Sequence, residues 1–320
     1  MADSSALVPA PDPLAPFLAE AEKFVRAAKA SNTVKAYRSD WRSFASFSSA
    51  RELSALPATA ATVAAYAAHA SLRLKANTIE RHLAAISQAH QLAGVPNPVE
   101  DKLVRTVMAG IRRAKGTAQK GKEPLSAELL RKMFSGMPDD LRAARDRALL
   151  LVGFAGAFRR SEIVSVRHED VRFTDEGVVI TIPRSKTDPE GEGHTIGLPY
   201  GSYPESCPVR ALENWLERSN ITYGYLFTRV GRWGGEVTGT PISDHQLAKI
   251  IKRLARAAGL DADVFSGHSL RSGLATAAAE GGATERAIMD QTRHRSLKQV
   301  RKYIRRGSLF RDNAAARTGL

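Results

Sequence analysis

Cysteine is almost absent from this chain of 320 residues, since Cys207 is the only one. A single cysteine excludes an internal disulfide framework and a cysteine-rich zinc site. No apolar run approaches the roughly 20 residues needed to span a bilayer. The first basic residue, Lys23, comes too late for the charged start of a secretory signal. We therefore expect a cytoplasmic protein with no membrane partner.

Acidic residues are also scarce. The chain has 33 Asp and Glu against 47 Lys and Arg, a formal net charge of +14. A two-metal nuclease needs clustered carboxylates, which are few near the motifs described below, and no Walker A phosphate-binding motif is present. We expect no metal and no cofactor. The basic balance favours a polyanionic partner, but net charge alone does not choose among DNA, RNA and an acidic membrane.

The basic residues gather in two runs. Residues 293–311 contain eight basic side chains and no acidic one. The second run surrounds two glycines and consists of Arg112, Arg113, Lys115, Lys120 and Lys122. Either run alone could equally be a solvated face or a flexible tail.

Hydrophobic periodicity divides the chain into two domains. Residues 1–16 are rich in Ala and Pro, and we expect them to be disordered. Residues 17–115 show helical periodicity throughout and predict an all-helical module. Residues 116–123 lack apolar periodicity and read as a basic linker. A second domain, 124–320, follows, with a C-terminal tail at 306–320.

The second domain is predicted to be mainly helical with a small antiparallel sheet, which makes the fold class mainly α with an α+β C-terminal domain. Three short segments, Val171–Phe173, Val178–Ile182 and Thr195–Leu198, have strand character. A polar loop from Pro183 to His194 separates the last two.

Two pairs of side chains at a spacing of three could each hold a phosphate. In His268-Ser-Leu-Arg271 both side chains share one helix face, and Gly267 and Ser269 place His268 at the helix entrance, where backbone N–H groups favour an anion. In Arg159-Arg-Ser-Glu162 the carboxylate could orient the guanidinium of Arg159 and leave its other donors for a phosphate. Taken singly, an unrelated His and Arg or an ordinary intrahelical ion pair is the commoner interpretation.

Three further residues complete the candidate set. Lys186 lies in the polar loop between two predicted strands, where a lysine could reach a groove and donate a proton. His294 precedes the last predicted helix, and Tyr303 follows nine residues later within the basic run. A solvated loop lysine and a tyrosine with a packed ring and a wet hydroxyl are the simpler readings of these residues alone.

Together these motifs resemble the catalytic signature of the tyrosine recombinase (phage integrase) family, and in particular its Cre-like and Xer-like simple recombinases. The family has an Arg at a helix start, a Lys in a β-hairpin loop, His-x-x-Arg on a helix, a His or Trp, and a Tyr nine residues later. The predicted N-terminal helices resemble the family's core-binding domain. Two positions depart from the pattern, because Arg293 and Ala157 stand where many members have Gly. The first departure puts the local turn in doubt and could add a phosphate contact.

The resemblance implies a site-specific recombinase that cleaves and rejoins double-stranded DNA through a 3′-phosphotyrosyl intermediate at Tyr303, without metal or ATP. Arg159 and Arg271 would grip the nonbridging oxygens, and His268 would assist proton transfer. His294 would donate a hydrogen bond to the phosphate, Lys186 would protonate the leaving 5′ oxygen, and Glu162 would orient Arg159.

Affinity for DNA should come from phosphate contacts and specificity from helices in the major groove. The predicted DNA-binding residues are Lys75, Arg81, His82 and Gln88 near one helix, the five residues of the second basic run, and His245, Lys249 and Arg253 on a helix of the catalytic domain.

The expected partners are a DNA site with inverted repeats and further copies of the chain, as a dimer on each site and a tetramer in synapsis. Leu309 and Phe310 in the tail would dock on a neighbouring protomer, although packing on their own domain is an open alternative. Two rival functions also stay open. A type IB topoisomerase would relax plasmid without a target site, and a non-catalytic DNA-binding protein would bind its site without forming a covalent adduct.

Overall fold

The computed structural model describes residues 31–116, 121–183, 193–232, 234–294, 296–307 and 318. The predicted disordered start, half of the linker, Lys120, Lys186, Leu309 and Phe310 lie outside these ranges. The chain divides into two compact units, Met1–Lys120 and Gly121–Leu320, and the division falls within the predicted linker. None of the described helices combines the length and the apolar character that crossing a bilayer requires.

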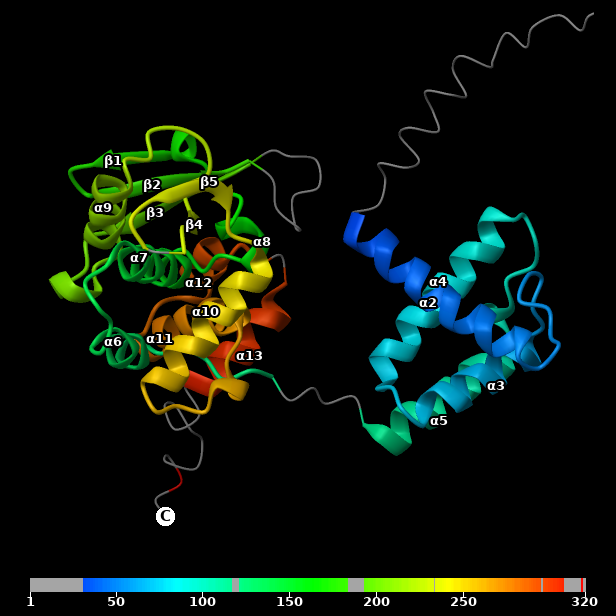
Figure 1. Ribbon diagram of the computed structural model, residues 1–320. Helices are drawn as coiled ribbons and strands as arrows, with labels where there is room; N and C mark the ends of the chain where they lie inside the picture. The colour runs from blue at the N-terminus through cyan, green and yellow to red at the C-terminus, as the bar shows by residue number, and fades with distance from the viewer. Residues whose placement is uncertain are drawn as a thin grey trace, which may run out of the picture. The chain divides into compact units, whose positions relative to one another are not determined.

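The first unit is helical throughout its described residues (Figure 1). Its helices are α2 (Ser31–Ser49), α3 (Ala60–Ser71), α4 (Ala76–Leu92), the 3-10 turn η1 (Pro98–Glu100) and α5 (Lys102–Lys115). Helix α2 packs on α4, and α3 packs on α5. A small core holds them together, with Phe44, Val63, Ile79 and Ile86 fully buried. The all-helical reading of this segment is confirmed.

Polar caps mark the start of α3 and α5. The hydroxyl of Thr59 accepts a hydrogen bond from the backbone N–H of Thr62 at the start of α3. Asp101 accepts one from Leu103 N–H at the start of α5. A side chain that accepts such a bond replaces one of the partners that the first turn of a helix lacks. Asp101 is also the C-cap of η1, so it separates this turn from α5.

The second unit combines helices with two small antiparallel sheets. Its helices are α6 (Ala127–Phe134), α7 (Leu141–Ala155), α8 (Arg160–Ile163), α9 (Pro208–Ser219), α10 (Asp244–Ala257), α11 (Gly267–Glu280), α12 (Glu285–Thr292) and α13 (Leu297–Gly307), with 3-10 turns η2 (His168–Asp170), η3 (Pro204–Ser206) and η4 (Ala262–Val264). The first sheet has the order β1 (Val171–Thr174), β2 (Gly177–Ile182) and β3 (His194–Pro199). These strands match the three predicted segments to within a residue or two at each end.

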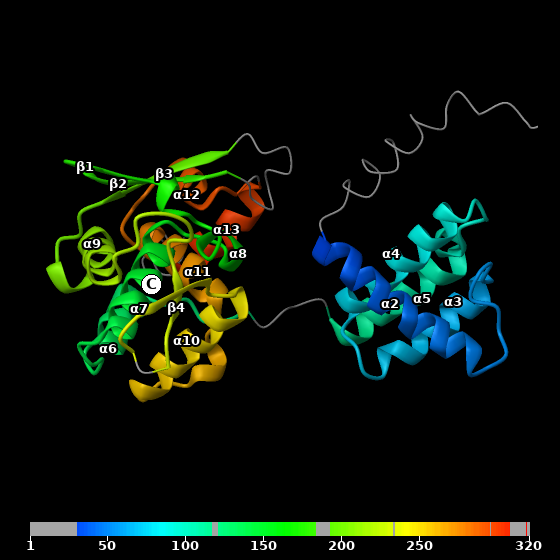
Figure 2. The same ribbon diagram turned by 45° about the horizontal axis from the view of Figure 1, so that its top comes forward.

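The three-stranded sheet lies along one side of the helices of the second unit, and α9 packs on β3 (Figure 2). Ile180 of β2 pairs with Val171 of β1 and with Ile196 of β3. Alternate residues of β2 point into the core, which also buries Trp215 of α9. The indole N–H of Trp215 donates to the carbonyl of Leu226 at 2.8 Å, so this large side chain is buried without an unpaired donor.

The second sheet was not predicted. It pairs β4 (Thr228–Val230) with β5 (Val237–Pro241), and its register shifts between Thr228 and Val230. The first strand has three residues, and the second reads Val-Thr-Gly-Thr-Pro, with neither apolar alternation nor a hairpin turn of two residues. The sequence therefore could not predict these two strands, because an alternating pattern is recognised only over at least four residues.

Candidate active site

The turn between α7 and α8 places the first candidate arginine. The chain leaves α7 through Gly156 and Ala157, and Ala157 has a φ of +46°, in the left-handed region. Phe158 is buried, and Arg159 becomes the N-cap of α8. Glu162, at the third position of this helix, accepts hydrogen bonds from the backbone N–H of Arg159 at 2.9 Å and from its Nη1 at 2.5 Å. One carboxylate therefore caps the helix and holds the guanidinium, as the spacing predicted.

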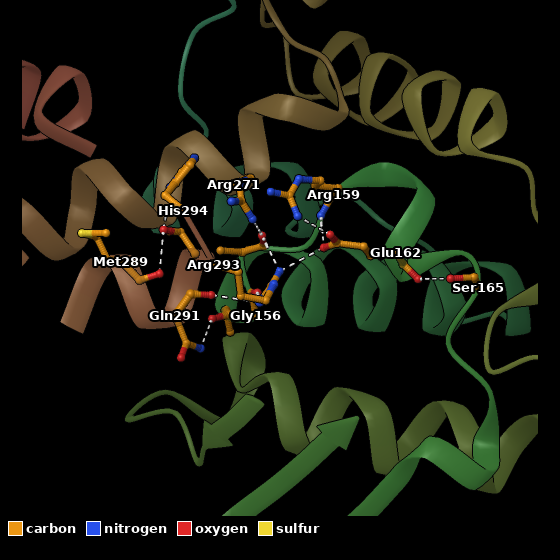
Figure 3. Close-up of polar contacts among 12 residues, drawn as sticks. Gly156, Arg159, Glu162, Ser165, Arg271, Met289, Gln291, Arg293 and His294 are labelled. Atoms are coloured by element: carbon orange, nitrogen blue, oxygen red, sulfur yellow. Dashed lines mark hydrogen bonds and ion pairs between the residues drawn. The ribbon is translucent and has the colours of Figure 1, made fainter. Parts of the chain in front are cut away.

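Glu162 is almost completely buried and has a second cationic partner. Nη2 of Arg293 lies 3.0 Å from its Oε2, as Figure 3 shows. Burial is the largest single influence on the carboxyl and raises its pKa. The backbone N–H of Arg159 and the charges of Arg293 and Arg159 act in the opposite direction, and together they hold the pKa of Glu162 below its ordinary value. Glu162 is therefore ionised at neutral pH.

Helix α11 presents His268 and Arg271. Ser266 caps the helix by accepting a hydrogen bond from His268 N–H, so His268 stands at the helix entrance as predicted. Nη1 of Arg271 donates to the carbonyl of Ala157 at 2.7 Å. Within the described part of the chain, Nη2 of Arg271 is buried and lacks a hydrogen-bond partner. This leaves a donor available for a ligand.

The electrostatics around Arg271 favour an anion. Burial, followed by the charges of Arg159 and Arg293, lowers the pKa of Arg271 to about 9. A lowered arginine pKa means that the cation is poorly compensated in the unliganded site. Because a phosphate would supply negative charge, binding one would raise the pKa of Arg271 and offer an acceptor to the free donor.

Tyr303 of α13 lies against both candidate histidines. Its hydroxyl is 2.9 Å from Nε2 of His268, and the ring centroids of Tyr303 and His294 are 5.7 Å apart. Burial, followed by the charges of Arg271, Arg159 and Arg160, lowers the pKa of His268. His268 is therefore neutral at pH 7, and in the tautomer that carries its proton on Nδ1, Nε2 can accept the tyrosine proton. The structure thus brings together six of the seven predicted catalytic residues, and Lys186 lies outside the described residues.

His294 is held by its own turn. Its Nδ1 lies 2.6 Å from the hydroxyl of Thr292, which itself donates to the carbonyl of Ile288 at 2.6 Å. Burial, followed by the charges of Arg271, Arg159, His268 and Arg293, lowers the pKa of His294 to about 3. The ring is therefore neutral in this state.

Arg293, noted above only as a departure from the family pattern, is part of this site. Its φ of +54° lies in the left-handed region, which explains why a glycine would suit the position. The sequence left open that the guanidinium reaches outward to a phosphate, and it does not. It turns inward, where it donates to the carbonyls of Gly156, Ala157 and Gln291 and pairs with Glu162 (Figure 3). Many family members have glycine at the positions of Ala157 and Arg293. That glycine indicates a positive φ, but it does not predict the contacts of the Arg293 side chain.

Arg160, the next arginine of the same motif, points elsewhere. Its Nη2 lies 4.0 Å from Asp244 of α10, and its aliphatic stem packs over Gly267. A β-carbon at Gly267 would come within 2.1 Å of the Arg160 side chain. Arg159, and not Arg160, therefore belongs to the site.

The residues predicted to contact DNA in the first unit differ in exposure. Lys75 is exposed at the N-cap of α4, and Gln88 is half-buried on the same helix. Arg81 is half-exposed and makes a two-point contact with the buried Asp40. His82 is buried, with Nδ1 2.6 Å from the Tyr66 hydroxyl and Nε2 3.1 Å from Asp40. Its burial contradicts the prediction that His82 contacts DNA. Helical periodicity could not separate it from exposed neighbours, since a histidine is as often inside as outside.

The other basic residues line exposed surfaces of their own units. Arg112, Arg113 and Lys115 are exposed at the end of α5, and Lys122 is exposed near the start of the second unit. On α10 the exposed side chains at a spacing of four are His245, Lys249 and Arg253. Two of the basic residues already have acidic partners, since Arg112 pairs with Glu80 and Arg253 pairs with the buried Asp146. That these residues contact DNA stays a prediction.

The described residues of the site offer hydrogen-bond donors that suit an anion. The described residues contain no cluster of three or more His, Cys, Asp or Glu side chains that could bind a metal ion. Arg159, Arg271 and Arg293 instead surround the single carboxylate of Glu162, with two neutral histidines and a tyrosine hydroxyl beside them. Such an arrangement can hold a phosphate with an aromatic hydroxyl next to it.

Comparison with known proteins gives the same result. Residues 123–308 match the model of the phage integrase family. The integrase/recombinase xerD homolog of Selenomonas ruminantium is 42% identical over 304 residues, 93% of this chain and 88% of that protein. Recombinase cre of Escherichia phage P1 is 28% identical over 72% of this chain and 71% of its own.

Among solved structures, XerH site-specific recombinase bound to its palindromic difH substrate has a TM-score of 0.61 and 18% sequence identity. That match covers 81% of this chain and 72% of the XerH chain, and it supports the fold. The sequence matches extend over the helical unit as well as the second unit, and they agree with the site geometry. The chain therefore belongs to the phage integrase family and is a tyrosine recombinase, an enzyme that acts on DNA.

Proposed function

We propose that this tyrosine recombinase cleaves and rejoins DNA at specific sites through a covalent 3′-phosphotyrosyl link to Tyr303. The observation that carries the proposal is the 2.9 Å contact between Nε2 of His268 and the Tyr303 hydroxyl, beside Nη2 of Arg271, which has no partner among the described residues. A phenol has an ordinary pKa of about 10, so it needs a base and nearby cations to react at neutral pH. Both are present here.

In the proposed cleavage step, Oη of Tyr303 attacks the phosphorus and the bond between phosphorus and the 5′ oxygen breaks. The tyrosine proton passes to Nε2 of His268. The departing 5′ oxygen takes a proton from Lys186, a role that the family resemblance assigns. Rejoining is the reverse reaction, and it needs no ATP because the phosphotyrosyl link retains the energy of the phosphodiester.

Arg159 and Arg271 would stabilise the charge that develops on the nonbridging oxygens. Both are fixed before DNA binds, Arg159 by Glu162 and Arg271 by the Ala157 carbonyl. Donors fixed in advance need no reorganisation during the reaction, and each is worth about 2.7–4 kcal/mol in comparable sites.

His294 is proposed to donate a hydrogen bond to the phosphate, and its contact with Thr292 decides which ring nitrogen carries the proton. Since Thr292 donates its only hydroxyl proton to Ile288, the short contact at Nδ1 requires His294 to donate from that nitrogen. A neutral ring then has no proton on Nε2 to offer a phosphate. His294 must therefore take up a proton when a phosphate binds, and the negative charge of the phosphate would raise its low pKa.

We further propose that the DNA site contains inverted repeats, that a dimer occupies each site and that synapsis forms a tetramer. The exposed basic residues of α5 and α10 would contact the backbone and grooves of DNA. Leu309 and Phe310 would dock on a neighbouring protomer and couple cleavage to assembly. The cytoplasm, where the DNA is found, is the proposed location.

A covalent-trapping experiment tests the proposed chemistry. Duplexes that bind Tyr303→Phe are selected from a random library, then nicked near the selected site so that cleavage cannot be reversed. Wild type should form an adduct that survives denaturation, and Tyr303→Phe should form none. Tyr223→Phe, at a tyrosine that is 75% exposed, serves as the matched control and should react like wild type.

The two rival functions give different results in the same assays. Sequence-selective binding without any adduct would identify a non-catalytic DNA-binding protein. Relaxation of a supercoiled plasmid without the selected site would identify topoisomerase activity. For assembly, removal of residues 308–320 should abolish the tetramer on paired sites, and unchanged assembly would refute docking in trans.

A further inference from the structure

Arg293 has an unusual backbone conformation together with a buried side chain. It follows α12 with φ +54° and ψ +43°, and its side chain is 3% exposed. A non-glycine residue at positive φ is strained, and such strain persists only where the surrounding structure fixes it. The contacts of the side chain show what fixes it here.

The Arg293 guanidinium connects three separate segments of the second unit. Nη1 donates to the carbonyl of Gly156 at 3.0 Å and to that of Gln291 at 2.9 Å. Nη2 donates to the carbonyl of Ala157 at 3.0 Å and to Oε2 of Glu162 at 3.0 Å. The group therefore joins the end of α12 to the turn after α7 and to the start of α8, as Figure 3 shows.

Two of these acceptors also hold residues that face the substrate. The Ala157 carbonyl accepts a hydrogen bond from Arg271, and Glu162 accepts two from Arg159. We propose that Arg293 is a positioning residue, which fixes Arg159 and Arg271 for the reaction through Glu162 and the Ala157 carbonyl without touching the phosphate. This inference rests on the proposed function, in which those two arginines grip the scissile phosphate.

Strain at Ala157 makes the dependence on Arg293 specific. Ala157 has a φ of +46° and is completely buried, so its β-carbon favours relaxation to the right-handed region. Arg293 opposes that relaxation because it holds the carbonyls of both Gly156 and Ala157. Without the guanidinium the Ala157 peptide would rotate, and the acceptor of Arg271 would move with it. A glycine at position 157 has no such tendency and should tolerate the loss of Arg293.

A buried arginine could instead serve only general stability. In that case, replacing Arg293 would lower the melting temperature but would leave the reaction rate of the folded, DNA-bound protein unchanged. It would also give no reason for Ala157→Gly to restore activity. The test therefore separates the rate of the bound enzyme from folding and from DNA affinity.

The variants are Arg293→Met, which keeps the length of the side chain, and Arg293→Gly, which removes both the guanidinium and the strain at 293. Arg286→Met is the matched control. Arg286 also lies on α12, but its side chain is 93% exposed, and its ion pair is a long surface contact of 3.9 Å between Nε and Oδ2 of Asp290. Each variant is assayed for adduct formation in a single turnover at saturating DNA, well below its melting temperature. DNA affinity is measured separately.

Arg293→Met and Arg293→Gly should each slow adduct formation at least 100-fold, with DNA affinity within threefold of wild type. Arg286→Met should react within twofold of wild type. Adding Ala157→Gly to Arg293→Gly should recover at least tenfold of the lost rate. If Arg293→Met does not fold, the two Arg293→Gly variants decide. Rates within threefold of wild type, or no recovery with Ala157→Gly, would overturn the proposal.

A crystal structure of Arg293→Gly gives a readout that does not depend on activity. We expect Ala157 to leave the left-handed region and the bond from Arg271 to the Ala157 carbonyl to break. Unchanged geometry at both places would overturn the positioning role even if the enzyme reacts through Tyr303. Conversely, wild type that forms no adduct would refute the proposed function, while the crystal structure would still decide whether Arg293 holds the two arginines.

Discussion

Replacing Glu162 with glutamine should destabilise the second unit strongly, although the two side chains have almost the same shape. The carboxylate accepts two hydrogen bonds from Arg159 and one from Arg293, and it is 2% exposed. Glutamine offers one acceptor oxygen, and its NH₂ group would face another donor. Arg293 would then stay buried with no anionic partner. Loss of one partner of a buried ion pair costs about 3–5 kcal/mol.

Urea unfolding measures this cost directly. All variants carry Trp41→Phe, so that fluorescence reports on the second unit, where Trp215 is buried. Glu162→Gln should lower the free energy of unfolding by about 3–5 kcal/mol without changing the dependence on urea concentration. The matched control, Glu217→Gln, removes an exposed carboxylate of α9 and should stay within about 0.5 kcal/mol of its parent. A loss below about 1 kcal/mol for Glu162→Gln would refute the account of the buried pair.

The pH dependence of the same experiment provides a second check. The folded-state pKa of Glu162 lies below its ordinary value of 4.5. A depressed carboxyl pKa stabilises the folded state fully above the unfolded pKa, and this contribution is lost as the pH falls through the folded pKa. The difference between wild type and Glu162→Gln should therefore be constant from pH 6 to 8 and should shrink below pH 4.5. A difference that grows toward acid pH would contradict this sign.

Three further predictions concern the reaction. Arg271→Lys should slow adduct formation about 100- to 1,000-fold, because lysine cannot both donate to the Ala157 carbonyl and present a second donor to the phosphate; single-turnover rates at saturating DNA check this. Binding of site DNA by Tyr303→Phe should be coupled to proton uptake at His294, since its pKa of about 3 in the free protein must rise on binding. Affinity should then weaken as the pH rises from 6 to 8, with a smaller slope in His294→Gln, and calorimetry in buffers of different ionisation enthalpy measures the protons. Chelation of divalent cations with EDTA should leave the single-turnover rate within twofold, and a larger loss would contradict metal-free cleavage.

Sequence was informative where function depends on residue type at a fixed spacing. Arg159 with Glu162, and His268 with Arg271, were paired by a spacing of three. In the structure Arg159 is hydrogen-bonded to Glu162, and His268 and Arg271 lie on neighbouring turns of α11. Spacing alone could not show that Tyr303 lies against His268. The family resemblance supplied that long-range information, because residues 35 positions apart have no local signal that connects them.

The contacts of buried polar groups were beyond the sequence. Arg293 belongs to a basic run, and a charge there is usually solvated, yet its side chain lies inside the protein with four acceptors. His82 likewise shares a helix with exposed polar residues but completes a buried network with Tyr66 and Asp40. In both cases tertiary packing decides the environment, and neither helical periodicity nor charge patterning contains that information.

Gly267 has no β-carbon, and this allows the first turn of α11 to lie close to the side chain of Arg160 of α8. The stem of Arg160 occupies the space that any larger residue at 267 would need. A β-carbon there would meet Cγ and Cδ of Arg160, so this side chain of α8 would have to move away from the first turn of α11, which carries the proposed proton acceptor His268. The close approach of α11 and Arg160 thus depends on a residue with no side chain, one that a search for reactive groups would pass over.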